Sequence, residues 1–492
     1  MIRLRYYLLV LAGVIPCLSV GQSMPQLEAA IRQVDQDAGM RSAGWSITVM
    51  DAATGRIITQ HNSTRSLATA STMKVLTTAT ALALLGPDFT FETRLEYDGE
   101  LTNGILSGNL YIRGGGDPSL GSERLGEAYS LDNLMIRWTK AVKAAGILEV
   151  RGRVVADDRA CSTQLVPDGW NWEDIGNYYG AGAGAINVNE NAYRLDLRPG
   201  ARVGSATEVL RTDPVMEDMV FVNELTTGAP GSGDNAYIYG APYTAVRYLR
   251  GTIPAGVSSF SIKGSMADPA LYAARRLTEE LILCGIKVSA APVSGRTEQM
   301  MGRSLTPGFR KTIDRYYSPP LRDLVYHTNL RSINLYAEAL ALQIAAHQGK
   351  TASTAQGAAA IEAYWKTQGV DTEGMSIQDG SGLTPSNAVT TLQMASILCR
   401  IRQAGYYEDF RNSLPVAGQT GTLKGIGAGT LAEGRIRAKS GTIEGVRAYA
   451  GYAELPDGRV LAFSMTAQHF SCTSRYVASL METLMVRIVQ GK

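Results

Sequence analysis

The chain has 492 residues, of which 45% are hydrophobic and 19% charged, and this balance is ordinary for a globular protein. A chain of this length exceeds what one hydrophobic core usually holds, so we expect two or three domains. The 47 basic and 45 acidic residues give a formal net charge of +2 without a basic block, which argues against binding to nucleic acid or to an anionic membrane surface.

The first residues are typical of a secretory signal peptide. Two arginines precede a short apolar stretch, residues 6–15, and small residues follow near Gly21. We expect cleavage after Gly21 and a mature chain that is secreted or periplasmic. Cys17 is an alternative lipoprotein anchor, but Pro16 stands where such an anchor requires a small residue, which favours plain secretion. No later segment is long and apolar enough to predict a membrane span.

The cysteines leave the redox state open. Four remain after cleavage, and either free thiols or any of three disulfide pairings fit their spacing. No two of them have the C-x-x-C spacing of a zinc site, and we expect neither a metal nor another cofactor. The four are Cys161, Cys284, Cys399 and Cys472.

The start of the mature chain predicts a hairpin between two helices. Residues 24–40 have the apolar spacing of a short amphipathic helix. Residues 45–50 alternate as a strand does, and residues 56–60 form the returning strand after a turn. A second helix runs from Ser71 to the Gly-Pro pair that ends it.

The middle of the chain predicts mostly β structure. Residues 157–264 are rich in Gly, Asn and Tyr, which indicates short strands joined by many turns. Further strands are expected at 93–97, 105–108, 109–112 and 150–156, and helices at 131–145 and 268–284.

The last third returns to longer elements. Helical spacing predicts helices at 321–347, 355–367, 390–404 and 474–489. Three strands joined by tight turns are expected at 435–439, 448–454 and 460–466. Because strands stand at both ends of the chain with helices between them, we expect one sheet built from both termini.

Ser71 and Lys74 form an S-x-x-K pattern at the start of a predicted helix. Residues three apart share a helix face, so the hydroxyl and the amine can meet. The positive field of the helix N-terminus favours an alkoxide on Ser71 and a neutral amine on Lys74, and a desolvated lysine can activate a serine nucleophile. Alone, the pattern is more often just a serine near a helix start and a solvated lysine, because short motifs recur by chance.

Two further segments change this interpretation. Ser332 and Asn334 form a Ser-x-Asn element in the helical region, and Lys439 begins the run Lys-Ser-Gly-Thr at a strand end. Each is ordinary by itself, as a helix cap or a strand end. Together, in this order and on these elements, the three motifs are the set known from penicillin-binding proteins and β-lactamases.

The sequence therefore resembles the D-alanyl-D-alanine carboxypeptidase/endopeptidase family, the class C low-molecular-mass penicillin-binding proteins. Roughly 260 residues separate Lys74 from Ser332, far more than a compact β-lactamase carries. The resemblance covers nearly all of the mature chain. It extends to residues 85–89, to Asp117-Pro118, to residues 334–338 and to residues 379–383.

The resemblance implies an α/β (α+β) multi-domain fold. Its catalytic domain is a penicillin-binding-protein/β-lactamase-like sandwich, in which helices flank an antiparallel sheet. We expect a signal peptide at 1–21, a catalytic domain formed by 22–92 and 300–492, and one or more mostly β accessory domains at 93–299 near its mouth.

The family also implies roles for the matching residues. Ser71 attacks the carbonyl between two D-alanines, and Lys74 takes its proton. Ser332 relays a proton to the leaving amine, and Asn334 orients the substrate amide. Lys439 supplies positive charge near the substrate carboxylate and holds Ser332. The backbone N–H groups of Ser71 and Thr442 form the oxyanion hole, and Ser440, Gly441 and Thr442 line the substrate site.

Two positions depart from the family pattern. Ser440 stands where threonine is usual, and because the hydroxyl is kept we expect carboxylate binding to survive. Pro385 stands where many relatives carry an arginine that helps to bind the carboxylate of a diamino acid. Asp174 is a candidate for the free amine of a diaminopimelate-type side chain, and Tyr179 for its stem. Both fit equally well as a solvated acid and a half-buried tyrosine.

The sequence thus predicts a serine peptidase that acts on peptidoglycan stem peptides. It would remove the terminal D-alanine, cut D-alanyl cross-links, or do both, and β-lactams would acylate Ser71. One rival is a β-lactamase, although no second-base motif is evident for a deacylating water. The other is a peptidoglycan-binding scaffold with an inactive site, against which the intact motif set argues.

Overall fold

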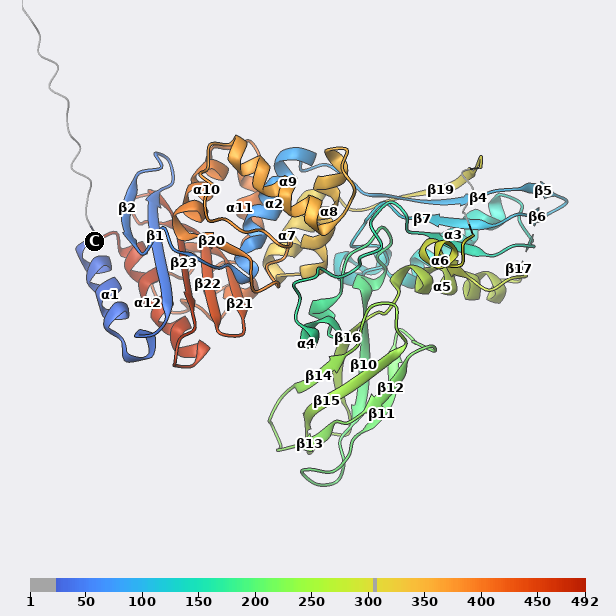
Figure 1. The fold of residues 1–492 in the computed structure, drawn as a ribbon, viewed down its shortest axis with the longest axis horizontal. Coiled ribbons are helices and arrows are strands. Elements are labelled where there is room, and N and C mark those ends of the chain that lie inside the picture. Colours follow the sequence, from blue (N-terminus) through green and yellow to red (C-terminus); the bar gives the residue numbers. More distant parts are fainter. Residues whose placement is uncertain (1–23, 304–307) are drawn as a thin grey trace, which may run out of the picture.

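The computed structural model describes residues 24–303 and 308–492, shown as a ribbon in Figure 1. The expected signal peptide, its cleavage after Gly21, and Cys17 lie outside the described residues. The molecule is elongated. One half contains a sheet formed by both ends of the chain, and the other half is formed by the middle of the chain.

The central sheet has five antiparallel strands in the order β2-β1-β23-β22-β21. It joins the first strands of the described chain to the last three, which confirms the sheet predicted from both termini. The interior residues of β1 are all buried, because helices cover both faces of the sheet. The strands are β1 (Gly44–Asp51), β2 (Ile57–His61), β21 (Ile436–Ile443), β22 (Val446–Glu454) and β23 (Val460–Gln468).

Two helices from opposite ends of the chain cover one face of this sheet. They are α1 (Pro25–Gln36) and α12 (Ser474–Gln490), which pack together over a core that includes Trp45 and Phe463. The other face is covered by α10 (Thr391–Gln403), behind which a helical layer follows. That layer contains α2 (Met73–Leu85), α7 (Leu321–Arg331), α8 (Asn334–His347), α9 (Thr354–Thr367) and α11 (Tyr407–Ser413).

The predicted helix over 321–347 is interrupted in the structure. α7 ends at Arg331, and Ser332 adopts a left-handed backbone conformation with φ of 59° before α8 begins. The apolar spacing continues across this break because both helices contribute to one core, so periodicity could not reveal it. The break places the serine at a helix junction that faces β21.

Short elements were missed because their stability depends on tertiary packing. The helices α4 (Trp172–Ile175), α6 (Gly295–Met300) and α11 were not predicted. Nor was the antiparallel pair of β3 (Ser66–Ala68) with β20 (Ala388–Thr390), which connects the segment before Ser71 to the segment after residue 383.

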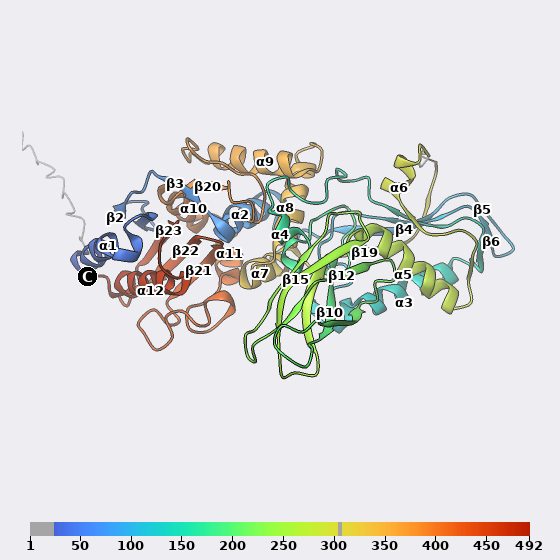
Figure 2. The same ribbon diagram turned by 60° about the horizontal axis from the view of Figure 1, so that its bottom comes forward.

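The middle of the chain forms two β-rich layers that extend from the half with the central sheet (Figures 1 and 2). The first contains a five-stranded and a four-stranded sheet, against which α3 (Leu131–Ala144) and α5 (Pro269–Leu283) pack. Its strands are β4 (Glu92–Tyr97), β5 (Glu100–Thr102), β6 (Ile105–Ser107), β7 (Leu110–Arg113), β8 (Glu149–Val150), β9 (Val154–Asp157), β17 (Lys287–Val288), β18 (Val293–Ser294) and β19 (Lys311–Tyr317).

The second layer is a smaller β unit that shares a hydrophobic core with the first. The many short strands expected between 157 and 264 are therefore confirmed. They are β10 (Ala192–Arg198), β11 (Glu208–Asp213), β12 (Val220–Asn223), β13 (Thr226–Gly228), β14 (Asn235–Tyr239), β15 (Val246–Pro254) and β16 (Phe260–Ser265).

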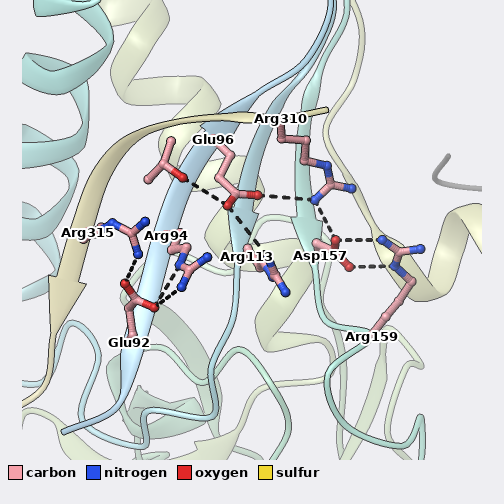
Figure 3. A network of polar contacts seen from close by, with 9 residues as sticks. Glu92, Arg94, Glu96, Arg113, Asp157, Arg159, Arg310 and Arg315 are labelled. Atoms are coloured by element: carbon pink, nitrogen blue, oxygen red, sulfur yellow. Dashed lines mark hydrogen bonds and ion pairs between the residues drawn. The ribbon is translucent and has the colours of Figure 1, made fainter. Parts of the chain in front are cut away.

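An ion-pair network crosses the sheet where the chain enters and leaves the middle region (Figure 3). Arg310, just before β19, bonds Asp157 at 2.8 Å and lies 3.7 Å from Glu96. Burial alone would raise the pKa of Asp157. The hydrogen bonds and charges of Arg159 and Arg310 outweigh burial, and they lower this pKa to about 2. Glu92 of β4 similarly pairs with Arg315 of β19. The contacts of Glu96 and Glu92 connect β4, the first strand of the region, to β19 and the residue before it. The contact of Asp157 connects β9 to the same segment.

Because β19 pairs with β4, we propose that the inserted part of the chain extends to about residue 317 and that the catalytic domain resumes there. Cys161, Cys284, Cys399 and Cys472 are all free thiols. Within the part of the chain that the structure describes, no helix has both the length and the apolarity needed to cross a bilayer.

Candidate active site

Ser71 lies in a 3₁₀ turn, Ala70–Thr72, that leads directly into α2. Its backbone N–H therefore belongs to the first turn of the helix, where N–H groups have no intrahelical acceptor. β21 passes close to this turn at Gly441, where an added Cβ would lie 3.1 Å from the Ser71 nitrogen and 2.8 Å from the Thr69 carbonyl oxygen. Glycine at 441 thus lets the strand approach the serine.

Lys74 is fully buried one turn after Ser71. Its Nζ lies 2.6 Å from Asn334 Oδ1, 2.7 Å from the Ser381 carbonyl oxygen and 3.0 Å from Ser71 Oγ. The first two atoms only accept hydrogen bonds, so they take both N–H groups of a neutral amine. The lone pair of that amine is then directed to the Ser71 hydroxyl, which is the geometry of a general base.

The charge state of Lys74 fits this geometry. Burial lowers its pKa to about 7, against the opposing effects of Asp379 and Glu338, whose charges raise it. At neutral pH much of the lysine is therefore unprotonated and able to accept a proton. We expected the field of the helix N-terminus to keep this amine neutral. The main cause of its lowered pKa is instead the loss of water on burial.

A tight turn around Asp379 holds the Ser381 carbonyl against Lys74. The Asp379 carboxylate accepts hydrogen bonds from four donors: Gly382 N, Thr384 N, Asn387 Nδ2 and Trp170 Nε1. Gly382 has a φ of +80°, and an added Cβ there would lie 1.9 Å from the Ala70 carbonyl oxygen. Residue 382 must therefore be glycine for the turn to fit beside Ser71.

Glu338 of α8 supports the same turn from below. It is almost fully buried, and its carboxyl oxygens accept from Gly380 N at 3.1 Å and Ser381 N at 2.8 Å. Burial and the neighbouring Asp379 raise its pKa to about 8. Glu338 lies in residues 334–338, a segment that matched the family but implied no role for this residue. Its contacts identify it as a residue that positions the turn.

Ser332 and Lys439 form a second serine–lysine pair opposite the first. Lys439 Nζ donates to Ser332 Oγ at 2.9 Å and to the Ser440 carbonyl oxygen at 2.6 Å. The lysine is fully buried, and burial together with the charge of Lys74 holds its pKa well below the usual range. Lys439 is therefore placed to hold the Ser332 hydroxyl in the site.

A cavity of about 260 Å³ opens between the two pairs. Ser71, Ser332, Ser440 and Thr442 line it as the sequence predicted, whereas Thr422 and Arg447 were not foreseen. Thr422 follows no recognised motif. Arg447 could have been found from the hairpin register, because Thr442 and Arg447 are paired across the tight turn between β21 and β22.

The exposed edge of β21 provides a second N–H beside Ser71. Ala438 donates its N–H outward to the Pro415 carbonyl, away from β22. Strand N–H groups alternate in direction, and the β21–β22 register is regular, so the Thr442 N–H points to the same side. Together with the Ser71 N–H, this orientation supports the expected oxyanion hole.

The inserted region contacts the site through Tyr179 and Trp170. Asn334 Nδ2 donates to the Tyr179 carbonyl oxygen at 2.8 Å. The side chains of Asp174 and Tyr179 bond each other next to this contact, and burial raises the pKa of both groups. Neither is among the cavity-lining residues, and Pro385 is exposed beside the turn that carries Ser381.

Metal-ligand types are not gathered in this region or elsewhere in the described chain. Within residues 24–303 and 308–492, no group of three or more His, Cys, Asp or Glu side chains is arranged to hold a metal ion.

Trp170 provides a test of how the inserted region supports the site. We expect Trp170→Phe to lower the free energy of unfolding by about 1–3 kcal/mol, because a buried Asp379 oxygen loses the indole N–H that it accepts at 2.9 Å. Trp172→Phe is the matched control, since Trp172 is 52% exposed and two residues away. Urea unfolding measures both, and equal stability of the two variants would contradict this role.

Two carboxypeptidases are similar to the chain over most of its length. The chain is 29% identical over 469 residues to the D-alanyl-D-alanine carboxypeptidase of Actinomadura sp. (strain R39), covering 92% of this chain and 84% of that protein. It is 26% identical over 413 residues to D-alanyl-D-alanine carboxypeptidase DacB of Haemophilus influenzae, covering 83% and 82%.

Solved structures show the same fold. Penicillin binding protein 4 (dacB) from Haemophilus influenzae superposes with a TM-score of 0.77 at 22% identity, covering 93% of this chain and 98% of that chain. The same protein complexed with a β-lactam superposes with a TM-score of 0.75. The model of the D-Ala-D-Ala carboxypeptidase 3 (S13) family matches residues 27–489, and the chain therefore belongs to that family.

Proposed function

We propose that the chain is a serine D-alanyl-D-alanine peptidase that cleaves peptidoglycan stem peptides through an acyl-enzyme on Ser71. The observation that carries the proposal is the buried Lys74, whose two N–H groups are occupied by carbonyl oxygens while its lone pair faces Ser71 Oγ. Membership of the S13 family and the carboxypeptidase relatives support the same activity.

Acylation follows from the first serine–lysine pair. Ser71 Oγ attacks the carbonyl carbon of the penultimate D-alanine, and its proton passes to Lys74 Nζ, which lies 3.0 Å away. The carbonyl oxygen becomes negatively charged, and the N–H groups of Ser71 and Thr442 stabilise it. Such donors typically contribute a factor of about 10² or more in rate.

Collapse of this intermediate requires a proton on the leaving nitrogen. Ser332 lines the cavity and is held by Lys439 at 2.9 Å, so it is placed to deliver that proton as the C–N bond breaks. D-Alanine, or a cross-linked peptide amine, then leaves as the neutral amine. The proton that Lys74 took from Ser71 replaces the one that Ser332 delivered, so both residues return to their starting states. Water then attacks the Ser71 ester and gives a proton to Lys74. When the ester C–O bond breaks, this proton returns to Ser71 Oγ and the free acid leaves.

A β-lactam would follow the same acylation step, because it presents an amide and a carboxylate as the peptide does. Its amide lies in a strained ring. Its leaving nitrogen stays attached to the acyl group through the ring, which keeps that nitrogen in the site. The described residues that line the cavity include no carboxylate to activate a deacylating water. This favours a long-lived adduct and disfavours the β-lactamase alternative.

Endopeptidase action on cross-links and a secreted or periplasmic location are further parts of the proposal. Asp174 and Tyr179 remain candidates for the side chain of the diamino acid, because the Tyr179 carbonyl accepts from Asn334 at the edge of the site. Pro385 provides no charge at the position where many relatives carry arginine. Selectivity for that side chain would then rest on the inserted region.

We predict that Ser71→Ala abolishes both covalent labelling by benzylpenicillin and D-alanine release from a D-alanyl-D-alanine peptide. Intact-protein mass spectrometry measures the adduct, and a D-amino-acid oxidase assay measures release. Ser479→Ala on the exposed face of α12 is the control and should retain both activities. Rapid loss of a wild-type adduct with drug hydrolysis would support a β-lactamase, and absence of both adduct and product a scaffold.

The acylation rate should increase with pH. Lys74 must be unprotonated to accept the Ser71 proton, and its pKa is about 7, so the rate should fall about tenfold per pH unit below about pH 6 and level off above about pH 8. Rapid-quench mass spectrometry of benzylpenicillin labelling between pH 5 and 9 measures this. A rate that still rises tenfold per unit from pH 8 to 9 would contradict the assignment.

A further inference from the structure

Arg447 lies in the cavity wall beside the nucleophile, on β22. In the β21–β22 ladder it is directly opposite Thr442, and both side chains line the cavity that Ser71 enters. The family motifs of the sequence do not include this residue. Its chemistry differs from that of the other lining residues, which are Ser71, Ser332, Thr422, Ser440 and Thr442 and which carry only hydroxyl groups.

The guanidinium is held in a fixed orientation. Nη1 donates to Thr442 Oγ1 at 2.8 Å, while Nε and Nη2 donate to the Tyr449 hydroxyl at 3.0 and 2.7 Å. Tyr449 is itself fully buried, so it is a rigid support. Arginine has five N–H groups, and these contacts leave one on Nη1 and one on Nη2 that can donate to an anion such as a carboxylate.

The charge on this group is not neutralised by the protein. In the part of the chain that the structure describes, the contacts of Arg447 are hydroxyl groups and its ring neighbour Tyr449, and no ion pair joins it to an acidic side chain. An arginine remains protonated at any physiological pH. By contrast, burial lowers the pKa of Lys74 to about 7 and that of Lys439 well below its usual range.

Two hydroxyl groups that line the same cavity as the guanidinium have protons to donate. Because Thr442 Oγ1 accepts from Arg447, its own proton is left for a ligand. Ser440 Oγ donates to Thr422 Oγ1 at 2.7 Å, so the Thr422 proton is left in the same way. A cation with two directed N–H groups and two hydroxyl donors forms a site for one carboxylate.

We propose that Arg447 binds the carboxylate on the carbon next to the scissile nitrogen and is the main positive charge of the substrate site. This inference rests on the proposed function. A D-alanyl-D-alanine end, a cross-link to a D-centre and a penicillin all carry a carboxylate at that position. Lys439, which we expected both to supply charge near this carboxylate and to hold Ser332, makes the contact with Ser332.

The test compares an N-acylated Lys-D-Ala-D-Ala peptide with its C-terminal amide, which differs only in the carboxylate. For the wild type, we expect kcat/KM to be at least about 100-fold higher for the acid, because loss of one partner of a hydrogen-bonded charge pair has effects of that size. Arg447→Met should lower kcat/KM about 100-fold for the acid and less than threefold for the amide. Arg447→Lys, which keeps the charge but not the fork, should fall between.

Arg435→Met is the matched control, because Arg435 is exposed next to the opposite end of β21, and it should behave as wild type on both peptides. Equal loss on acid and amide in Arg447→Met, or no loss on either, would overturn the proposal. If that variant does not fold, Arg447→Lys and the wild-type ratio still decide, since equal wild-type rates on acid and amide also overturn it. Absence of wild-type turnover on both peptides, with no benzylpenicillin adduct, would instead reject the proposed function.

Discussion

The site depends on removing Lys74 from water. An exposed lysine keeps its proton at neutral pH, and a protonated amine cannot activate a serine. Here the amine is fully buried between α2, α8 and the turn around Asp379. The same surroundings supply both carbonyl acceptors of the amine. Burial lowers the pKa of the amine to about 7. In the proposed mechanism the serine needs no histidine, because Lys74, one helical turn away, serves as its base.

Burial of this lysine requires segments that are distant in the sequence to meet. Asn334 comes from the helix after the inserted region, Ser381 from a turn before α10, and Gly441 from the third-last strand. The inserted region contributes as well, through Trp170 to Asp379 and through the Tyr179 carbonyl to Asn334. The region is therefore in contact with the residues that hold the base, and changes in it can alter the chemistry.

Much of the fold and of the site could be predicted from sequence, because some constraints are local. The spacing of Ser71 and Lys74 on one helix, and the alternation in the terminal strands, depend on a few neighbouring residues. The break at Ser332 was missed because α7 and α8 bury their apolar faces in one core. The roles of Trp170, Thr422 and Glu338 depend on contacts that span 209, 18 and 42 positions of the chain, and that of Glu338 also on charge coupling after folding, which no local pattern records.

In the proposed mechanism the buried Lys74 amine moves protons, and the Arg447 guanidinium binds the substrate carboxylate. This mechanism requires that a substantial fraction of Lys74 is neutral at physiological pH. ¹³C NMR titration of the enzyme labelled at lysine Cε, with Lys74 assigned by comparison with Lys74→Arg, measures this directly. We predict a midpoint at about pH 7, and a midpoint near the ordinary lysine value of about 10.4 would contradict the mechanism.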